Sequence, residues 1–191
     1  MKAGADRDRR SEVRGQKAAR TGEMRPLAFV ALGSNIGDSR KIILEAMERL
    51  QVLSNAPILK SSLWRTSPVD CPPDSPEFVN AVVGLFPQKE ESPESLLSKL
   101  QDLEKEFGRR PKKILNEPRP LDLDLIAFGA ETRQTPELTL PHPRAHLRRF
   151  VLAPLDEIAP DLVLAGQGRA VRELLKDLVS AERVERTERQ G

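Results

Sequence analysis

Asp122 and Asp124 lie in the segment EPRPLDLDLIAFG, residues 117–129, where leucines flank and separate them. Side chains alternate between the two faces of a β-strand, so residues two apart share a face. The pattern therefore predicts a strand with both aspartates on one face and the neighbouring leucines on the other. Two adjacent carboxylates in a largely apolar strand repel each other and are costly to desolvate. A cation between them removes both costs, and oxygen ligands favour Mg²⁺. The alternative is an edge strand whose polar residues face water.

Basic side chains lie on both sides of this strand in the sequence: Arg109, Arg110, Lys112, Lys113 and Arg119 before it, and His142, Arg144, Arg148 and Arg149 after it. Arginine can bind phosphate oxygens through two parallel hydrogen bonds and can stabilise the charge of a transferring phosphoryl group. The combination predicts metal-assisted chemistry on a nucleotide. A charge run can also be a solvated face, and His142, between two prolines, can equally be an exposed loop histidine.

Predicted strands and helices alternate along the rest of the chain without a strict β-α-β order, which favours an α+β fold. Apolar runs predict strands over residues 27–32, 58–66 and 78–86. Helical spacing predicts helices after Asp38 or Ser39, from Ser92 to Gly108, and over 150–158 and 171–178. Phe78 and Asn80 share a strand face, where a ring and an amide suit a flat heterocycle. Their alternative is a core phenylalanine beside a strand-end asparagine. The turn Gly33–Gly37 resembles a phosphate cradle but is also compatible with a plain tight turn.

The chain has 191 residues, which suits one domain with a hydrophobic core, and its 31 basic and 29 acidic residues nearly balance. We expect a disordered basic tail over residues 1–25, a domain over 26–180 and a charged tail over 181–191; an alternative start is Met24. The chain has no apolar run of membrane-spanning length, so we expect no membrane segment. Cys71 is the single cysteine, which fits a reducing cytoplasm, and its proline-rich loop favours a passive thiol.

Six motifs carry a resemblance to a known family, in this order: GSNIGD, WRTSPV, FVNAVV, LEKEFGR, PRPLDLDLIAFG and LPHPRAHLRRFVLAPL. From about Leu27 to Leu178 the chain resembles 6-hydroxymethyl-7,8-dihydropterin pyrophosphokinases of folate synthesis. The resemblance implies a ferredoxin-like α+β sandwich, with a mainly antiparallel sheet and packed helices in three α/β/α layers. It also implies an ATP- and Mg²⁺-dependent diphosphokinase (EC 2.7.6.3) that transfers pyrophosphate from ATP to the pterin hydroxymethyl group and releases AMP.

The same resemblance implies residue roles. Asp122 and Asp124 would hold two Mg²⁺ ions, and the expected catalytic residues are Arg109, Arg119 and His142. The expected pterin contacts are Thr66, Ser67, Val69, Phe78, Asn80 and Phe150, with the two phenylalanines sandwiching the ring. The expected ATP contacts are Leu97, Gln101, Glu104, Arg109, Arg119, Leu125, Thr139, His142 and Arg148.

The expected reaction is in-line attack by the hydroxymethyl oxygen on the β-phosphorus of ATP, with loops 66–77 and 109–119 closing over the substrates. The chain departs from its relatives at Leu115-Asn116-Glu117, where many have Arg-Trp-Gly, and at Pro143, where some have an aromatic residue. The loop over residues 68–76 is one residue longer than in one form of the enzyme. We expect ATP and the hydroxymethyl dihydropterin as partners, no nucleic acid, and a monomer.

Two other classes are compatible with parts of the pattern. A nucleotidyltransferase of the Gly-Ser…Asp-x-Asp type would place its aspartates shortly after Gly-Ser, whereas Gly33-Ser34 and Asp122 are far apart in this sequence. A ferredoxin-like nucleic-acid or regulatory module would need exposed aromatics on its sheet, and aromatics make up only 4% of the chain.

Overall fold

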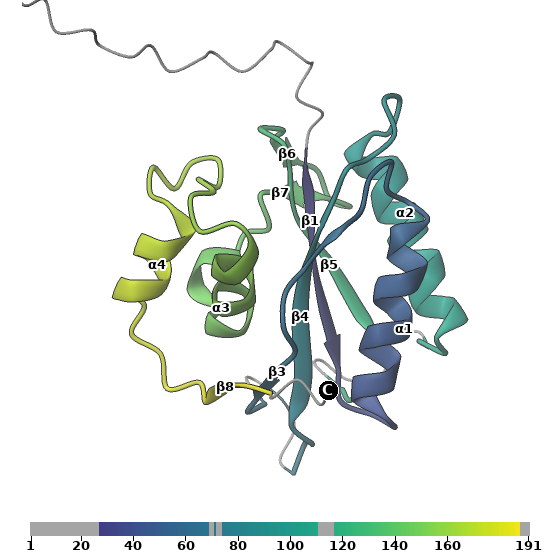
Figure 1. The fold of residues 1–191 in the computed structure, drawn as a ribbon, viewed down its shortest axis with the longest axis vertical. Helices are drawn as coiled ribbons and strands as arrows, with labels where there is room; N and C mark the ends of the chain where they lie inside the picture. Colours follow the sequence, from purple (N-terminus) through teal and green to yellow (C-terminus); the bar gives the residue numbers. More distant parts are fainter. Residues whose placement is uncertain (1–26, 69–70, 72–73, 111–116, 188–191) are drawn as a thin grey trace, which may run out of the picture.

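A computed structural model describes residues 27–68, 71, 74–110 and 117–187, so the tail expected over 1–25 and the expected contact Val69 lie outside the described residues. Its centre is a six-stranded sheet with the order β5-β1-β4-β3-β8, and β2 pairs with β4 beside this path (Figure 1). The strand pairs of this sheet are antiparallel. The predicted α+β class with a mainly antiparallel sheet is confirmed.

The three longest strands are β1 (Ala28–Ser34), β4 (Phe78–Leu85) and β5 (Asp122–Phe128). One face of the sheet packs against α1 (Ser39–Gln51) and α2 (Pro93–Glu106). The other face packs against α3 (Arg149–Ile158) and α4 (Val171–Asp177), so the sheet is the middle of three layers (Figure 1). We call these two sides the α1/α2 face and the α3/α4 face.

Alternation along the strands divides the core between these two faces. Leu123 of β5 and Leu32 of β1 are buried on the α1/α2 face, with Leu50 and Leu100 from the helices. Phe29 and its neighbours fill the α3/α4 face. Burial of a leucine or phenylalanine side chain contributes roughly 1.5–3 kcal/mol. Both faces are therefore held by apolar packing, except at the end of the sheet where β1 ends and β4 and β5 begin.

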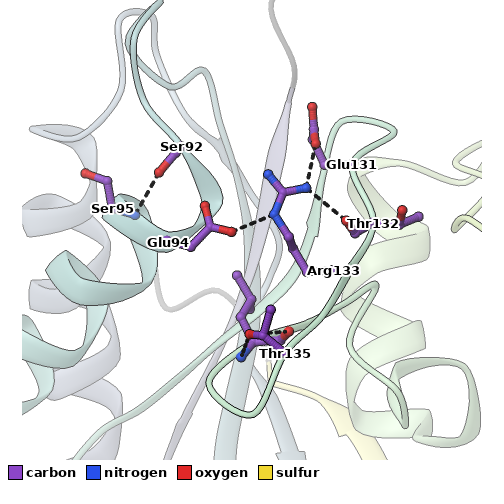
Figure 2. Close-up of polar contacts among 8 residues, drawn as sticks. Ser92, Glu94, Ser95, Glu131, Thr132, Arg133 and Thr135 are labelled. Carbon is purple, nitrogen blue, oxygen red and sulfur yellow. Dashed lines mark hydrogen bonds and ion pairs between the residues drawn. The ribbon is translucent and has the colours of Figure 1, made fainter.

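The helix starts follow local sequence signals. The Asp38 side chain accepts a hydrogen bond from the Lys41 N–H at 3.1 Å and caps α1. The Ser92 hydroxyl accepts from the Ser95 N–H at 3.1 Å (Figure 2). Pro93 takes the first position of α2. Gly108 follows that helix with a φ of +87°, which glycine adopts without steric cost. The predicted boundaries of this helix are confirmed.

The single strand predicted over residues 58–66 is wrong, because the structure divides it into β2 (Leu59–Lys60) and β3 (Trp64–Thr66). Only half of the backbone pairing continues at Ser61: its N–H donates to the Val82 carbonyl oxygen at 3.0 Å, but its hydroxyl rather than its carbonyl oxygen accepts from the Val82 N–H at 2.9 Å. Ser62 turns away to α3, where its N–H donates to Glu157 Oε2 at 2.9 Å. Both serines are buried. Side-chain hydrogen bonds therefore replace part of the backbone ladder and interrupt the strand between Lys60 and Trp64.

A short hairpin of β6 (Arg133–Gln134) and β7 (Thr139–Leu140) was not predicted. Arg133 ties it to the start of α2, since its Nε donates to Glu94 Oε1 at 2.6 Å (Figure 2). The Nη1 of Arg133 donates to Glu131 Oε2 at 2.7 Å and to the Thr132 carbonyl oxygen at 2.9 Å. These bonds fix the hairpin, which contacts β5.

The last strand, β8 (Val184–Arg186), lies inside the segment expected to be a charged tail over 181–191, and this expectation is wrong for residues 184–186. The strand pairs with β3 and places Val184 opposite Thr66. The strand consists of one apolar residue and two charged residues, and three residues are too few to show the alternation that would distinguish a strand from a tail. No helix among the described residues is long and apolar enough to cross a membrane.

Candidate active site

A cavity opens on the α3/α4 face of the sheet, at the end of β1 and the beginnings of β4 and β5. The predicted site residues in its lining are Thr66, Ser67, Phe78, Asn80, Arg109, Arg119, Asp122, Asp124, His142, Arg148 and Phe150. The lining also includes Ala31, Leu32 and Cys71, which had no expected role in a site, together with Gly33 of the candidate phosphate cradle and Arg144 of the basic run. Residues separated by up to 119 positions, from Ala31 to Phe150, therefore meet at one place.

Gly33 forms the floor between two kinds of wall. In the sheet it lies opposite Asn80 of β4 on one side and Asp122 of β5 on the other. A Cβ atom at position 33 would lie 2.9 Å from Asn80 Oδ1, 3.8 Å from Phe78 Cδ1 and 4.0 Å from Asp122 Cβ. The missing side chain therefore keeps open a passage from the aromatic and amide groups of β4 to the carboxylates of β5.

The two carboxylates of β5 share the cavity face, as the alternation predicted. The Asp122 side chain is 20% exposed. Burial, and then the neighbouring Asp122, raise the pKa of Asp124 to about 6, although Arg148, Arg119 and Arg109 oppose this. Among the described residues no group of three or more His, Cys, Asp or Glu side chains could hold a metal ion. The pair alone suits a cation such as Mg²⁺, which takes few protein ligands and completes its shell with water and phosphate.

Arg109 lies between two carboxylates. It forms a close ion pair with Glu104 at the end of α2, and its Nη1 lies 2.6 Å from Asp122 Oδ1. Glu104 Oε1 also accepts from the Leu123 N–H on the outer edge of β5 at 2.7 Å. Burial is the main reason that the pKa of Glu104 is raised to about 7, while the Leu123 N–H and Arg109 act in the opposite direction. Glu104, which was expected to contact ATP, thus holds Arg109 against β5.

Arg119 is fixed through its backbone rather than through its side chain. Its N–H donates to Asn35 Oδ1 at 2.9 Å, and the Asn35 N–H donates to the Arg119 carbonyl oxygen at 3.2 Å. The buried Asn35 also donates through Nδ2 to the Pro76 carbonyl oxygen at 3.4 Å. Nη1 of the guanidinium lies 3.4 Å from Asp122 Oδ2, while the buried Nε has no hydrogen-bond partner among the described residues. A buried donor without a partner is costly, so this group is well suited to a ligand oxygen.

His142 enters the cavity from the segment after β7. Its backbone N–H donates to the Ile126 carbonyl oxygen at 2.9 Å, which fixes it to β5. Burial, and then the neighbouring Arg148 and Arg144, lower the pKa of His142 to about 4. The imidazole is therefore neutral near pH 7. Its Nδ1 accepts from the Arg144 N–H at 3.3 Å, which leaves the proton on Nε2 as a hydrogen-bond donor.

Two further cations and an aromatic ring close the α3 side. The 3₁₀ helix η1 (Ala145–Leu147) carries the chain from Arg144 to Arg148 at the start of α3. The Arg148 guanidinium lies 5.3 Å from the ring centre of Phe150, within range of a cation–π interaction. Burial, and then Arg144, lower the pKa of Arg148, although Asp124 acts in the opposite direction. Crowded, partly desolvated arginines of this kind favour an anionic ligand.

The β4 side of the cavity offers a ring and an amide. Phe78 and Asn80 lie on the face predicted for them, and Asn80 is buried. The Asn80 Nδ2 donates to the Thr66 hydroxyl at 2.7 Å, so its Oδ1 is directed toward the space above Gly33. Ser67 follows on the same wall, but its N–H donates to the Arg183 carbonyl oxygen at 3.0 Å. That N–H is therefore not free for a ligand.

Five expected ATP contacts are not part of this lining: Leu97, Gln101, Glu104, Leu125 and Thr139. Gln101 on α2 and Thr139 on β7 are exposed, and Leu97 packs against the core. The Leu125 side chain is buried on the α1/α2 face, so only its backbone is available to a ligand. For these residues the expected contact remains a prediction.

Comparison with known proteins identifies relatives of this chain. The family model for 7,8-dihydro-6-hydroxymethylpterin-pyrophosphokinase matches residues 29–160. A 2-amino-4-hydroxy-6-hydroxymethyldihydropteridine pyrophosphokinase from Haemophilus influenzae is 40% identical over 150 residues, covering 78% of this chain and 91% of the relative. The protein of the same name from Synechocystis is 38% identical, with 79% and 75% covered. The folic acid synthesis protein fol1 of Pneumocystis carinii is 37% identical, but only 20% of it is matched.

Solved structures show the same fold at low sequence identity. A crystal structure of HPPK-DHPS in complex with substrates superposes with a TM-score of 0.60 and 13% identity, over 80% of this chain and 42% of that chain. The wild-type HPPK-DHPS of Plasmodium falciparum with SDX-DHP superposes with a TM-score of 0.62 and 13% identity, over 79% of this chain and 44% of that chain. The chain thus spans less than half the length of these structures.

Proposed function

The chain belongs to the 7,8-dihydro-6-hydroxymethylpterin-pyrophosphokinase family, and we propose that the cavity on the α3/α4 face is its active site. The protein is an ATP-dependent diphosphokinase that transfers pyrophosphate to 6-hydroxymethyl-7,8-dihydropterin in folate biosynthesis. One observation in particular supports placing this reaction in the cavity. Gly33 separates a ring-and-amide wall from a carboxylate-and-arginine wall, as a transfer between a heterocycle and a polyphosphate requires.

The dihydropterin belongs on the β4 side. Its flat ring would stack between Phe78 and Phe150, which both line the cavity, because aromatic rings provide favourable stacking for a heterocycle. The Asn80 Oδ1, directed over Gly33, would accept from N–H groups at the pterin edge. This orientation sends the hydroxymethyl group along the glycine floor toward β5.

The polyphosphate belongs on the β5 side. Asp122 and Asp124 would hold two Mg²⁺ ions, which when bound neutralise charge on the phosphate oxygens. The donor set fits this role, because Asp124 is a partly buried carboxylate beside a second carboxylate and three arginines, as its raised pKa reflects. The arginines neutralise much of this acidic pair, so the site accepts a metal together with an anion rather than a bare metal.

In the proposed step the hydroxymethyl oxygen bonds to the β-phosphorus, and the bond from that phosphorus to the oxygen bridging the α- and β-phosphates breaks. The electron pair leaves on AMP, and the hydroxyl proton passes to solvent or to a phosphate oxygen. Arg119 and Arg109 orient the transferred group and stabilise its charge. His142, neutral with its proton on Nε2, would donate a hydrogen bond rather than a full positive charge.

The reaction products test this proposal. Purified protein with ATP, Mg²⁺ and 6-hydroxymethyl-7,8-dihydropterin should yield AMP and the dihydropterin diphosphate in equal amounts, resolved by ion-pair chromatography. Release of inorganic pyrophosphate with a nucleotidylated product would instead indicate the nucleotidyltransferase alternative. Separation in sequence does not exclude that alternative, because the sheet places Gly33 opposite Asp122. The family relationship is what argues against it.

Gly33→Ala should impair pterin binding selectively. The added methyl group would lie 2.9 Å from Asn80 Oδ1 and must displace that amide. We expect the KM for the dihydropterin to rise roughly tenfold, since an ångström of misplacement at a site is costly, with a much smaller change in the KM for ATP. Steady-state kinetics with each substrate varied in turn measures this.

Gly166→Ala is the control, because it lies outside the cavity and no atom lies within 4 Å of its added Cβ. The φ of Gly166 is +78°, so a small loss of stability is the only expected effect of this substitution. Equal rises in both KM values for Gly33→Ala would contradict the assignment.

We also propose that the enzyme works as a monomer. Its mass in light scattering should stay at one chain across the concentrations used for activity, and a mass of two chains would contradict this.

A further inference from the structure

We propose that Glu182 is a positioning residue that sets the pterin-facing wall of the active site. This inference rests on the proposed function. Glu182 lies in the segment 181–187 at the end of the described chain, outside the cavity lining. Its Oε2 accepts a hydrogen bond from the Phe150 N–H at 3.1 Å, across 32 residues of sequence.

The bond matters because α3 starts without a cap of its own. Arg148 occupies the cap position and its side chain makes no capping hydrogen bond. The first N–H groups of a helix need acceptors, and a negative charge at this end is favourable. Glu182 supplies both from outside the helix. The residue that it holds, Phe150, is the ring that lines the cavity opposite β4.

The same segment also holds the other side of the pterin site. The Ser67 N–H donates to the Arg183 carbonyl oxygen at 3.0 Å, and the Arg183 N–H donates to the Ser67 hydroxyl at 3.1 Å. Neighbouring residues Glu182 and Arg183 therefore bind Phe150 and Ser67, one from each wall. The separation of the two walls is set by this one short piece of chain.

The segment stays in place without Glu182. β8 pairs with β3, and the Thr187 N–H donates to the Leu63 carbonyl oxygen at 2.9 Å. Arg186 binds the Ser62 hydroxyl and Glu157 Oε1, both at 2.8 Å. Removing the Glu182 carboxylate should therefore release Phe150 without detaching the strand. A role in position can thus be separated from a role in folding.

The test compares Glu182→Ala, Glu182→Gln and Glu185→Ala. Glu185 is the matched control, because it lies three residues along the same segment and its carboxylate hydrogen-bonds, among the described residues, to the exposed Arg183 side chain alone, at 2.8 and 3.2 Å. Binding of 6-hydroxymethyl-7,8-dihydropterin is measured by titration calorimetry with saturating Mg²⁺ and α,β-methylene ATP, in which the bond to be broken is replaced. The affinity for α,β-methylene ATP is measured separately.

For Glu182→Ala we expect the dihydropterin Kd to rise roughly tenfold, with the nucleotide Kd within about twofold of wild type. Glu182→Gln keeps an acceptor oxygen and should recover most of this loss, while Glu185→Ala should match wild type. If Glu182→Ala does not fold, Glu182→Asp replaces it: the shorter side chain withdraws the acceptor and should also weaken dihydropterin binding. Unchanged dihydropterin affinity in the folded variant would overturn the inference. Equal losses for both ligands would also overturn it, as would an equal loss in Glu185→Ala. Failure of wild type to bind the dihydropterin would instead reject the proposed function.

Discussion

Asp124→Asn is expected to abolish Mg²⁺-dependent transfer while leaving the metal-free protein at least as stable as wild type. The substitution keeps the shape of the side chain and removes one of two carboxylates proposed to hold the metal. Loss of a charged group that acts on a developing phosphate charge lowers kcat by roughly 10²-fold to 10³-fold or more. Release of AMP under saturating substrates measures this effect.

The expected stability of Asp124→Asn follows from the raised pKa of Asp124. Burial, and then Asp122, raise the pKa of Asp124 from 3.8 to about 6. For an acid this means that the folded state binds the proton more tightly than the unfolded state, so stability falls as the pH rises through this range. Above the pKa of about 6 in the folded state, the ionised Asp124 carboxylate lowers the free energy of unfolding by its full amount, whereas the neutral asparagine does not lower it. Thermal melts in EDTA at about pH 7.5 should show an equal or higher Tm for the variant, with the difference shrinking toward about pH 4.

Asp102→Asn is the matched control, because Asp102 is exposed on α2 and pairs only with Lys105, at 2.8 Å. It should change neither activity nor Tm appreciably, since exposed ion pairs contribute little. A large loss of stability in Asp124→Asn, or turnover within threefold of wild type, would contradict the account of this carboxylate.

Arg119→Lys is the second substitution with a large expected effect. The variant keeps the positive charge but loses the planar fork, including the buried Nε that has no hydrogen-bond partner in the described part of the chain. Lysine is a point charge and cannot hold phosphate oxygens in this way. We expect kcat to fall roughly 10²-fold or more, with little change in the KM for the dihydropterin.

The fold should tolerate this change, because Asn35 holds position 119 through backbone atoms that lysine also provides. Arg49→Lys is the control: Arg49 forms a surface pair with Glu106, and both side chains are about half exposed. Single-turnover measurement of AMP formation isolates the transfer step. An Arg119→Lys rate close to that of wild type and Arg49→Lys would show that the unpartnered Nε has no role in it.

The sequence predicted those parts of the site that depend on local periodicity. Alternation placed Asp122 and Asp124 on one face of β5, and the sheet confirms this. The same rule paired Phe78 with Asn80 on β4, and both line the cavity. In each case the pattern lies within a few residues, and a neighbouring apolar set identifies the buried face.

Contacts between distant residues were not predictable from one sequence. The segment after Gly33 suggested a phosphate cradle or a tight turn. In the structure the Asn35 side chain binds Arg119, 84 residues away, and the Ser34 hydroxyl donates to Ser39. A buried asparagine such as Asn35 must have hydrogen-bond partners, but the neighbouring sequence does not indicate which residues they are.

Short elements were missed for a related reason. The strand β8 looked like a charged tail, because three residues carry too little pattern to indicate pairing with β3. Cys71, interpreted as a passive loop thiol, lies in a connecting segment, where periodicity gives no information on which side chains line a cavity.

The central claim is that Asp122 and Asp124 hold the divalent ions with the polyphosphate, and counting bound metal tests it most directly. Mn²⁺ can stand in for Mg²⁺ at oxygen ligands, and free Mn²⁺ is quantified by electron paramagnetic resonance. With saturating α,β-methylene ATP, wild type should bind two Mn²⁺ ions per chain and Asp124→Asn should bind fewer, while Asp102→Asn should match wild type. Two ions bound by Asp124→Asn with unchanged affinity would contradict the account.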